Sequence, residues 1–277
     1  MLQKVAIFSK DNSAKTRDGV EKLVNELRNR GIQFYLFHKE DDAGILSDRP
    51  DLVLSVGGDG TFLETVLKVK ALGIPVAGVN TGRMGFLANI PGDEIGNSID
   101  QLCRNDFEIV ERSMIEIAKP ANIFDGETGE ALNEITIQKA NLSMIAIHVY
   151  VDEVFLNTYW ADGLIISTAT GSTAYNLSVG GPILSPGDES IIISPIAPHN
   201  LTIRPILVSG SSRLKMVMEA RADEYLVTCD FRFKRLPINE EIHIVRSGAK
   251  LKSVMLAGRD FYSTLRNRLM WGVDRRN

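Results

Sequence analysis

The sequence predicts an α/β N-terminal domain with a parallel, Rossmann-like sheet, followed by a β-rich, antiparallel C-terminal domain. In the first third of the chain, uninterrupted apolar runs alternate with segments of helical periodicity, which is typical of a parallel sheet covered by helices on both faces. From about Phe107 onward, apolar and polar residues alternate in strand-length runs without intervening helices. Such alternation is typical of antiparallel sheets with one packed face and one solvated face.

The elements of the first domain follow from these patterns in chain order. Residues 4–9 (KVAIFS) predict a strand, and residues 16–31 predict a helix that has its apolar residues on one face and ends at Gly31. Further strands are predicted at residues 34–37, 51–56 and 74–80, and a further helix at residues 61–73.

The second region contains runs of period two, separated by short polar turns. These runs lie at residues 115–118, 134–138, 145–159, 214–220, 225–228 and 241–245. They predict a β-rich domain, for which two layered sheets are one arrangement. We therefore expect an α/β domain over residues 1–115, a β-rich domain over 116–256, and a C-terminal helical segment over 257–277. Whether that segment packs on the first domain is left open by the sequence.

Composition and charge exclude several classes of protein. The 277 residues are 44% hydrophobic and 24% charged, with a formal net charge of −4, which is ordinary for a folded globular chain. The basic residues are dispersed, so we expect no nucleic-acid partner and no membrane partner. The densest basic cluster, LRNRLMWGVDRRN at residues 265–277, predicts a solvated helix face beside buried Leu265 and Leu269.

Targeting signals and metal-ligand patterns are also missing from the sequence. The N-terminal residues lack the long apolar core of a signal peptide, and no apolar run is long enough to span a bilayer. A cytoplasmic location is therefore predicted. The two cysteines and four histidines are scattered and match no metal or redox spacing, so no resident metal site is expected.

The stretch VGGDGT at residues 56–61 is the first candidate for chemistry. It follows an apolar strand and precedes a helix predicted to begin near Thr61, which puts it where open α/β sheets bind their ligands. Gly57, Gly58 and Gly60 would let backbone N–H groups approach a phosphate. A carboxylate repels phosphate, so Asp59 suits a hydroxyl group that it can aim and deprotonate. The alternative is a tight turn in which Asp59 or Thr61 caps the helix.

The pentapeptide GGDGT resembles the signature shared by NAD kinases, diacylglycerol-type lipid kinases and, with Ser for Thr, phosphofructokinases. All three transfer a phosphoryl group to a hydroxyl group, so the resemblance implies the type of reaction and leaves the acceptor open.

A second block, DGLIISTATGSTAYNLSVGGPILSP at residues 162–186, distinguishes these families. Its small polar side chains can supply neutral hydrogen bonds to ribose and amide groups, and they are Ser167, Thr168, Thr170, Ser172, Thr173, Asn176 and Ser178. The ring of Tyr175 can lie against a flat ring of a ligand. The alternative is a Ser/Thr-rich loop between strands.

This block is similar, almost residue for residue, to a motif of the NAD kinase family. The Asn133–Glu134 pair resembles the family's NE motif, although such a pair also occurs as ordinary turn residues at a strand entrance. The segments NTGRMGFLANI at 80–90 and PHNLTIRPILV at 198–208 resemble further family segments. The sequence departs from the family at Ala169, where proline is usual, and after Asp230, where FRFKRLP follows.

The resemblance implies transfer of the γ-phosphoryl group of ATP to the 2′-hydroxyl of the adenosine ribose of NAD⁺, giving NADP⁺ and ADP. Asp59 is the predicted catalytic base, beside a phosphate-binding turn of Gly57, Gly58, Gly60 and Thr61. The predicted dinucleotide-binding residues are Asn133, Glu134, Asp162, Thr170, Thr173, Ala174, Tyr175 and Ser178.

The resemblance also implies cofactors and partners. Mg²⁺ or another divalent cation is expected with ATP, and a homodimer or homotetramer is expected for the assembly. Inorganic polyphosphate as the donor and NADH as the acceptor stay open. The competing functions are a lipid kinase that uses the same pentapeptide and a dinucleotide-sensing module without catalysis.

Overall fold

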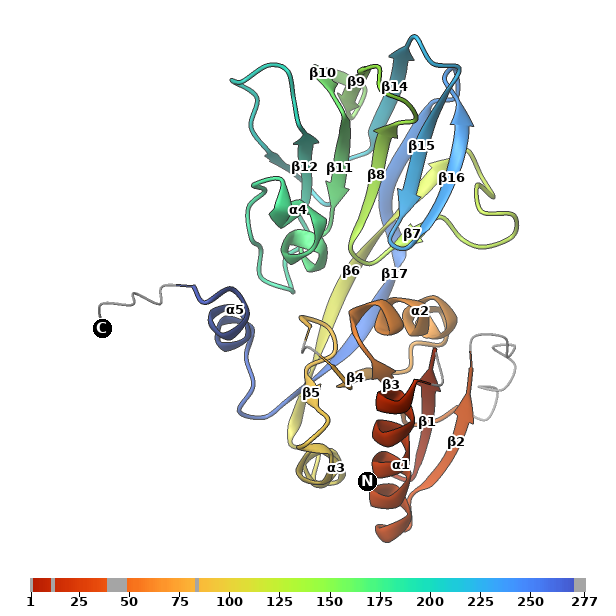
Figure 1. Cartoon of the computed structure of the whole chain (residues 1–277), viewed down its shortest axis with the longest axis vertical. Helices are drawn as coiled ribbons and strands as arrows, with labels where there is room; N and C mark the ends of the chain where they lie inside the picture. Colours follow the sequence, from red (N-terminus) through yellow and green to blue (C-terminus); the bar gives the residue numbers. More distant parts are fainter. Residues whose placement is uncertain (1, 11–12, 39–48, 83–84, 272–277) are drawn as a thin grey trace. The chain divides into compact units, whose positions relative to one another are not determined.

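The computed structural model describes residues 2–10, 13–38, 49–82 and 85–271 (Figure 1). The chain divides into two compact units. Unit 1 contains the residues up to Glu111 together with those from Leu251 onward, and unit 2 is Arg112–Lys250. Two long strands, β6 (Phe107–Lys119) and β17 (Ile242–Leu256), carry the chain from one unit into the other.

Unit 1 is built on a parallel sheet with the order β2-β1-β3-β4. Its strands are β1 (Lys4–Ser9), β2 (Gln33–Phe37), β3 (Leu52–Gly57) and β4 (Val76–Asn80). The short strand β5 (Ile90–Pro91) and the end of β17 also pair with β4 in parallel. The parallel sheet predicted for the first domain is confirmed.

Helices cover this sheet on both faces. Because successive side chains of a strand point to opposite faces, β3 shows which helix lies where. Leu54 belongs to the cluster that includes Leu27 of α1 (Ala14–Asn29) and Ile99 of α3 (Ile95–Cys103). The next residue, Ser55, accepts a hydrogen bond at 2.8 Å from Thr65 of α2 (Asp59–Val69), so α2 lies on the opposite face. A short 3₁₀ helix, Lys70–Leu72, follows α2.

Helix α2 begins at Asp59, two residues before the predicted start at Thr61. Gly58 is the N-cap and has an extended backbone, and its carbonyl accepts the N–H of Phe62 at 3.1 Å. The glycine ends the strand without a side chain to bury, so the helical hydrogen bonds begin directly after it. The GGDGT turn therefore forms the first turn of α2 rather than a loop before it.

Unit 2 is antiparallel throughout its registered strand pairs. A six-stranded sheet has the order β13-β12-β11-β8-β15-β16, and a second group of strands has the order β10-β9-β14-β17. The strands of the six-stranded sheet are β8 (Glu134–Lys139), β11 (Gly163–Ser167), β12 (Ile191–Ile196), β13 (Ile206–Val208), β15 (Glu224–Cys229) and β16 (Arg232–Pro237). The others are β9 (Ile145–Val151), β10 (Val154–Ala161) and β14 (Leu214–Ala220), with β7 (Glu130–Ala131) paired to β6.

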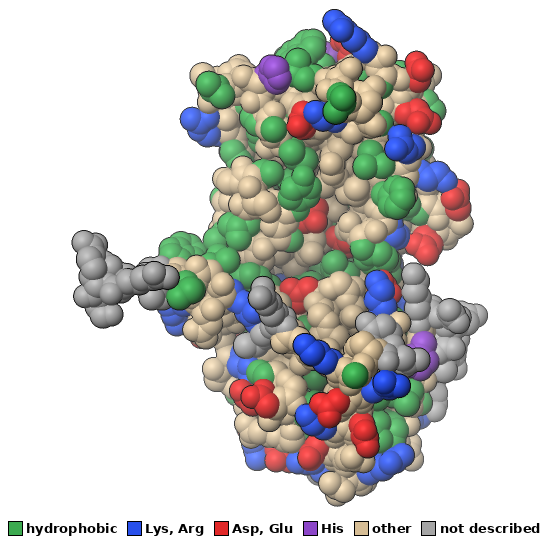
Figure 2. All heavy atoms as spheres, in the orientation of Figure 1, with side chains coloured by type: hydrophobic (Ala, Val, Ile, Leu, Met, Phe, Trp, Pro, Cys, Tyr) green, Lys and Arg blue, Asp and Glu red, His purple; other side chains and the backbone are tan. Residues whose placement is uncertain are grey.

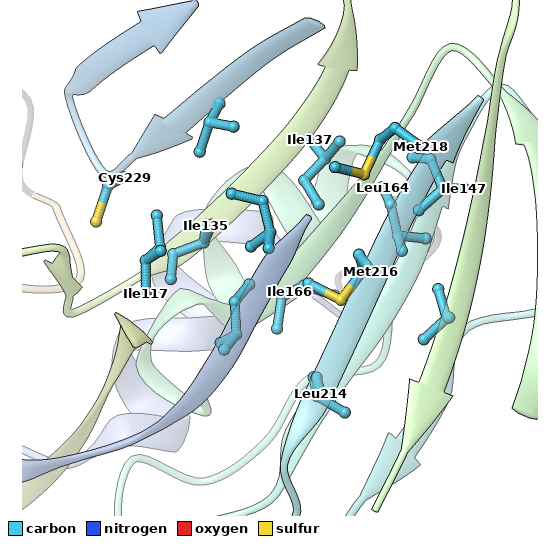
Figure 3. Packing of buried hydrophobic residues seen from close by; sticks show 14 of the residues in the cluster. Ile117, Ile135, Ile137, Ile147, Leu164, Ile166, Leu214, Met216, Met218 and Cys229 are labelled. Carbon is cyan, nitrogen blue, oxygen red and sulfur yellow. The ribbon is translucent and has the colours of Figure 1, made fainter. Parts of the chain in front are cut away.

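The two groups of strands share one hydrophobic core. Ile137 and Ile166 from the six-stranded sheet and Met216 and Met218 of β14 belong to the same buried cluster (Figure 3). This arrangement accounts for the alternation in the sequence, since every second residue of these strands enters the core. The predicted antiparallel, β-rich character of the second domain is confirmed.

The C-terminal segment ends in helix α5 (Phe261–Leu269), which belongs to unit 1. Leu265 is buried as predicted, but Leu269 is 38% exposed, so its predicted burial is wrong. The reason is that α5 ends at Leu269, before Met270 in the left-handed region, and of the two leucines only Leu265 is buried. Residues 272–277 of the predicted basic cluster lie outside the described residues.

Charge on the described surface is mixed. Figure 2 shows Lys and Arg side chains interspersed with Asp and Glu side chains on the face in view, without a continuous basic stripe. Within the described ranges, no helix combines the length and the apolar character that crossing a bilayer requires.

Candidate active site

The GGDGT turn lies at the carboxyl end of β3 and opens α2. Gly57 has φ of +155°, and a Cβ atom added to it would lie 2.3 Å from Oγ1 of Thr61. Only glycine fits at this position. A Cβ added to Gly58 or Gly60 would meet nothing within 4 Å, so the space beside these two residues is open to a ligand.

The carboxylate of Asp59 is held by the segment that follows β4. Its Oδ2 accepts the backbone N–H of Phe86 at 2.8 Å, and its Oδ1 accepts those of Leu87 at 3.1 Å and Ala88 at 2.9 Å. A Cβ added to Gly85 would lie 1.8 Å from Oδ1. The close approach of the backbone to the carboxylate therefore requires a residue without a side chain at position 85. Residues 83 and 84 of this segment lie outside the described residues.

These contacts decide the capping alternative for the turn. The N-cap of α2 is Gly58, with no side-chain capping hydrogen bond. Asp59 and Thr61 are both inside the helix, and Asp59 directs its carboxylate to a different segment of the chain. The alternative in which Asp59 or Thr61 caps the helix is therefore wrong.

All but one of the predicted site residues of unit 2 lie at one end of the six-stranded sheet, and the exception is Asp162. Strands β8 and β11 are neighbours, with Glu134 opposite Ser167, and the N–H of Thr168 donates to the carbonyl of Asn133 at 2.9 Å. The chain then forms a 3₁₀ helix over Thr170–Thr173 and a short helix α4 over Tyr175–Ser178. Asn133, Glu134 and the GSTAY segment are thus brought together by strand pairing.

Glu134 is a half-buried acid at this end of the sheet. Burial raises its pKa to about 8, and the charge of Asp230 acts in the same direction, whereas the backbone N–H of Tyr175 opposes the shift. Its Oε2 is buried and has no hydrogen-bond partner among the described residues. A carboxyl group in this setting holds its proton at neutral pH and can donate a hydrogen bond to a ligand.

Asp230 holds the Asn133–Glu134 pair in place. Its carboxylate accepts the backbone N–H groups of Leu132 at 2.9 Å, Asn133 at 2.8 Å and Glu134 at 3.2 Å. Burial raises the pKa of Asp230 despite these three hydrogen bonds. The resemblance to the family carried Asp230 over through the Cys-Asp pair that precedes the atypical FRFKRLP segment, but it left the role of Asp230 undefined.

Several polar side chains of the GSTAY region bond within the chain. Asn176 is fully buried, donates to the carbonyls of Ser172 at 3.2 Å and Pro182 at 3.0 Å, and accepts from Ser194 at 2.6 Å. Thr168 donates to the carbonyl of Leu132. These bonds fix the loop, while Tyr175 at its tip is 37% exposed.

Four more predicted residues of unit 2, Thr170, Thr173, Ala174 and Ser178, lie within or at the end of this loop. Thr170 is buried, and its Oγ1 accepts from Arg112 at 3.4 Å. Thr173 donates to the carbonyl of Thr170 at 3.3 Å, and Ala174 is the N-cap of α4. Ser178 is exposed at the end of α4. Asp162 precedes β11 and lies at the other end of that strand, where it forms an ion pair with Lys139 at 2.5 Å, so the structure does not bring Asp162 to this loop.

The described side chains do not form a resident metal site. No group of three or more His, Cys, Asp and Glu residues in the described ranges could hold a metal ion. Both carboxylate oxygens of Asp59 already accept backbone N–H groups. A Mg²⁺ ion that keeps its waters and binds mainly to the phosphates of a nucleotide needs few protein ligands, and the described side chains fit that kind of binding.

Comparison with known proteins identifies the family. Residues 21–107 match the ATP-NAD kinase N-terminal domain, and residues 132–256 match the ATP-NAD kinase C-terminal domain. The chain is 41% identical over 245 residues to an NAD kinase of Cytophaga hutchinsonii, covering 88% of this chain and 82% of that protein. It is 37% identical over 289 residues to an NAD kinase of Bacteroides fragilis, covering 99% of both. The chain belongs to the NAD kinase family.

Solved structures of the family share this fold. A crystal structure of yeast NADH kinase complexed with NADH has a TM-score of 0.85 at 22% identity and covers 99% of this chain and 89% of that one. The structure of an NAD kinase from Archaeoglobus fulgidus in complex with ATP has a TM-score of 0.77 at 26% identity. The match covers 97% of this chain and 99% of that one. The predicted family and phosphotransferase class are confirmed.

Proposed function

We propose that this protein transfers the γ-phosphoryl group of ATP to the 2′-hydroxyl of the adenosine ribose of NAD⁺, giving NADP⁺ and ADP. The observation that carries the proposal is the fixed position of Asp59 at the carboxyl end of β3. Of its two carboxylate oxygens, Oδ1 accepts two backbone N–H groups and Oδ2 accepts one. Since each carboxylate oxygen has two lone pairs, Oδ2 can still accept a hydrogen bond from the ribose hydroxyl.

In the proposed reaction the ribose 2′-oxygen attacks the γ-phosphorus, and the bond from that phosphorus to the β,γ-bridging oxygen breaks. The hydroxyl proton passes to Asp59 or, through it, to water. The transition state of phosphoryl transfer is loose, so alignment of the hydroxyl contributes more than full deprotonation. The open backbone at Gly58 and Gly60 leaves room for the phosphates beside the N-terminus of α2.

In unit 2, the proposed role of the residues around β8 and the GSTAY loop is to hold the nucleoside. Protonated Glu134 would donate a hydrogen bond through its unpartnered Oε2. Tyr175 offers an exposed ring for stacking. Asn133, Thr170, Thr173, Ala174 and Ser178 are proposed to surround the dinucleotide, with Asp230 holding the backbone of Asn133 and Glu134. Asp162, at the other end of β11, is proposed to contact the dinucleotide in the site of a neighbouring subunit.

A divalent cation is proposed to enter with ATP, where it neutralises phosphate charge. The assembly is proposed to be a homodimer or homotetramer. If the cation enters with ATP, activity should disappear in excess chelator and return with Mg²⁺, without a change in the circular dichroism of the protein. The oligomeric assembly is tested by light scattering of the purified protein. A monomer that retains full activity at the assay concentration would contradict the proposed assembly.

The direct test incubates the purified protein with each donor and acceptor and separates the phosphorylated products by chromatography, and NADP⁺ is also assayed through an NADP⁺-specific dehydrogenase. Separate reactions contain ATP or inorganic polyphosphate as the donor and NAD⁺, NADH or diacylglycerol as the acceptor. We expect NADP⁺ with ATP and NAD⁺. Phosphorylation of diacylglycerol alone would establish the lipid kinase instead. Saturable NAD⁺ binding without release of ADP over hours would establish a sensing module.

A further inference from the structure

A polar cavity lies in unit 1, between α3 and the segment that contains α5. Its volume is about 390 Å³, within the range of small-molecule sites. Its charged lining residues are Glu94, Arg259 and Arg268. Arg259 pairs with Glu94 and also donates to the carbonyl of Asn89 at 2.9 Å. Arg268 therefore contributes the excess positive charge of the lining.

Two atoms of this lining lack hydrogen-bond partners among the described residues. Nη2 of Arg268 and Oδ1 of Asn89 are both buried and both unpaired. Asn89 is only 7% exposed, and its amide nitrogen faces the sulfur of Met255 at 3.5 Å. Burial lowers the pKa of Arg268, and the charge of Asp59 only partly offsets this. A buried donor and a buried acceptor left unpaired in one cavity are costly unless a ligand or water satisfies them.

The chemistry of the two atoms specifies the ligand. A guanidinium only donates hydrogen bonds and carries a positive charge, whereas an amide oxygen only accepts them. A ligand that satisfies both atoms presents an anionic oxygen to Arg268 and a hydrogen-bond donor, O–H or N–H, to Asn89. We propose that this cavity binds a phosphate group, whose P–O⁻ accepts from Arg268 and whose P–OH donates to Asn89. Since the second pKa of a phosphate monoester is about 6, the singly protonated form is available near neutral pH, and a carboxylate has no equivalent donor.

The cavity shares a segment of chain with the catalytic turn. Asn89 directly follows Ala88, whose N–H donates to Asp59 at 2.9 Å. The ring of Phe86, whose N–H also donates to Asp59, packs on Phe261 of α5 with ring centroids 6.4 Å apart. A phosphate bound to Arg268 and Asn89 would thus stabilise the segment that holds Asp59. The phosphate has two sources, free orthophosphate or the terminal phosphate of the donor, and the second rests on the proposed function.

The test is titration calorimetry of the full chain with sodium orthophosphate and, separately, sodium tripolyphosphate. The variants are Arg268→Gln, which removes the charge of the guanidinium, and Asn89→Asp. The second variant places a carboxylate where the ligand would bind. The matched control is Arg266→Gln, which removes the same charge from an exposed position of α5. Because hydrogen bonds to charged groups are the strong ones, each of the two site variants should weaken phosphate binding about tenfold or more, and the control less than about twofold.

The two sources give different results. If free phosphate is the ligand, Arg268→Gln loses orthophosphate binding and keeps the KM for ATP. If the donor is the ligand, tripolyphosphate binding weakens and the KM for ATP rises about tenfold, while the KM for NAD⁺ is unchanged. The proposal is overturned if neither ion binds the wild-type protein, or if Arg268→Gln and Arg266→Gln behave alike. A wild-type protein that binds phosphate but forms no NADP⁺ would contradict the proposed function alone.

Discussion

The carboxylate of Asp230 accepts the backbone N–H of Asn133 at 2.8 Å, across 97 positions of sequence. The same carboxylate accepts the N–H groups of Leu132 and Glu134. In Asp230→Asn, an amide NH₂ replaces one acceptor oxygen and faces a backbone N–H. Because hydrogen bonds to a carboxylate are lost, we expect a loss of about 1.5–3 kcal/mol in the free energy of unfolding. We also expect a several-fold higher KM for NAD⁺, since the Asn133–Glu134 pair loses its support.

Urea unfolding and steady-state kinetics check this prediction together. The matched control is Asp223→Asn, an exposed aspartate that precedes β15 in the same unit. An Asp230→Asn protein as stable as wild type, with an unchanged KM for NAD⁺, would show that the three hydrogen bonds contribute nothing.

Local patterns in the sequence predicted most of the fold. The helical face of α1 and the buried strands β1, β3 and β4 have a single clear periodicity, and the structure contains them at the predicted places. Helix α3 was not predicted, although Ile95, Ile99 and Leu102 are buried on one face. Gly96, Asn97 and Ser98 are poor helix formers, and tertiary packing overrides them.

The candidate site was predictable only where its residues are contiguous in the sequence. The GGDGT turn and the GSTAY loop can be read directly as strings. The contacts of Asp59 with Ala88, and of Asp230 with Asn133, join segments 29 and 97 positions apart. Such contacts depend on strand order, which no local pattern reveals. Asn176 shows the same limit of sequence-based prediction. Its polar side chain was expected to offer a hydrogen bond to a ligand, but its amide nitrogen donates to the carbonyls of Ser172 and Pro182.

Gly57 and Gly58 should respond differently to the same added methyl group. Gly57→Ala brings a Cβ to 2.3 Å from Oγ1 of Thr61 at φ of +155°, so we expect a loss of about 1–3 kcal/mol in the free energy of unfolding. Gly58→Ala has open space and should retain wild-type stability. If phosphates of ATP approach this turn, Gly58→Ala should nevertheless raise the KM for ATP. Thermal melting and ATP kinetics separate the two effects, and a Gly58→Ala enzyme with normal ATP kinetics would argue against phosphate contact at this position.

Glu134 should make stability depend on pH. Its pKa is about 8 in the folded protein and 4.5 ordinarily, so between these values the folded state holds a proton that the unfolded state has lost. Stability contributed by this group therefore falls as pH rises from about 4.5 to 8, by at most about 1.4 kcal/mol per pH unit. Glu134→Gln, which is neutral at every pH, should become progressively more stable than wild type across this window. Urea unfolding at pH 5.5, 6.5 and 7.5 measures the difference.

The control for this pH series is Glu224→Gln, which removes an exposed carboxyl group from the same unit. Its stability should follow that of the wild-type protein at all three pH values. Parallel pH curves for wild type and Glu134→Gln would mean that Glu134 is ionised in the folded protein at neutral pH.

Asp59→Asn tests the proposed reaction at its centre. The amide can accept through one oxygen, but its NH₂ group cannot accept a proton from the ribose hydroxyl. We expect kcat to fall by about two orders of magnitude or more, in line with the usual contribution of a positioned base, and the KM for NAD⁺ to stay within several-fold. The contacts with Phe86, Leu87 and Ala88 add a second expectation. Because part of this network is lost, the melting temperature should also drop.

The two effects of Asp59→Asn are separable. A purely structural role would lower stability and raise the KM for both substrates, with kcat of the bound complex retained. A chemical role lowers kcat at saturating substrates, at temperatures where circular dichroism shows the variant fully folded. Asp18→Asn, which removes an exposed carboxylate from the ion pair with Lys22 on α1, should change neither quantity. Full turnover in folded Asp59→Asn would exclude this carboxylate from the chemical step, whatever its contribution to the loop.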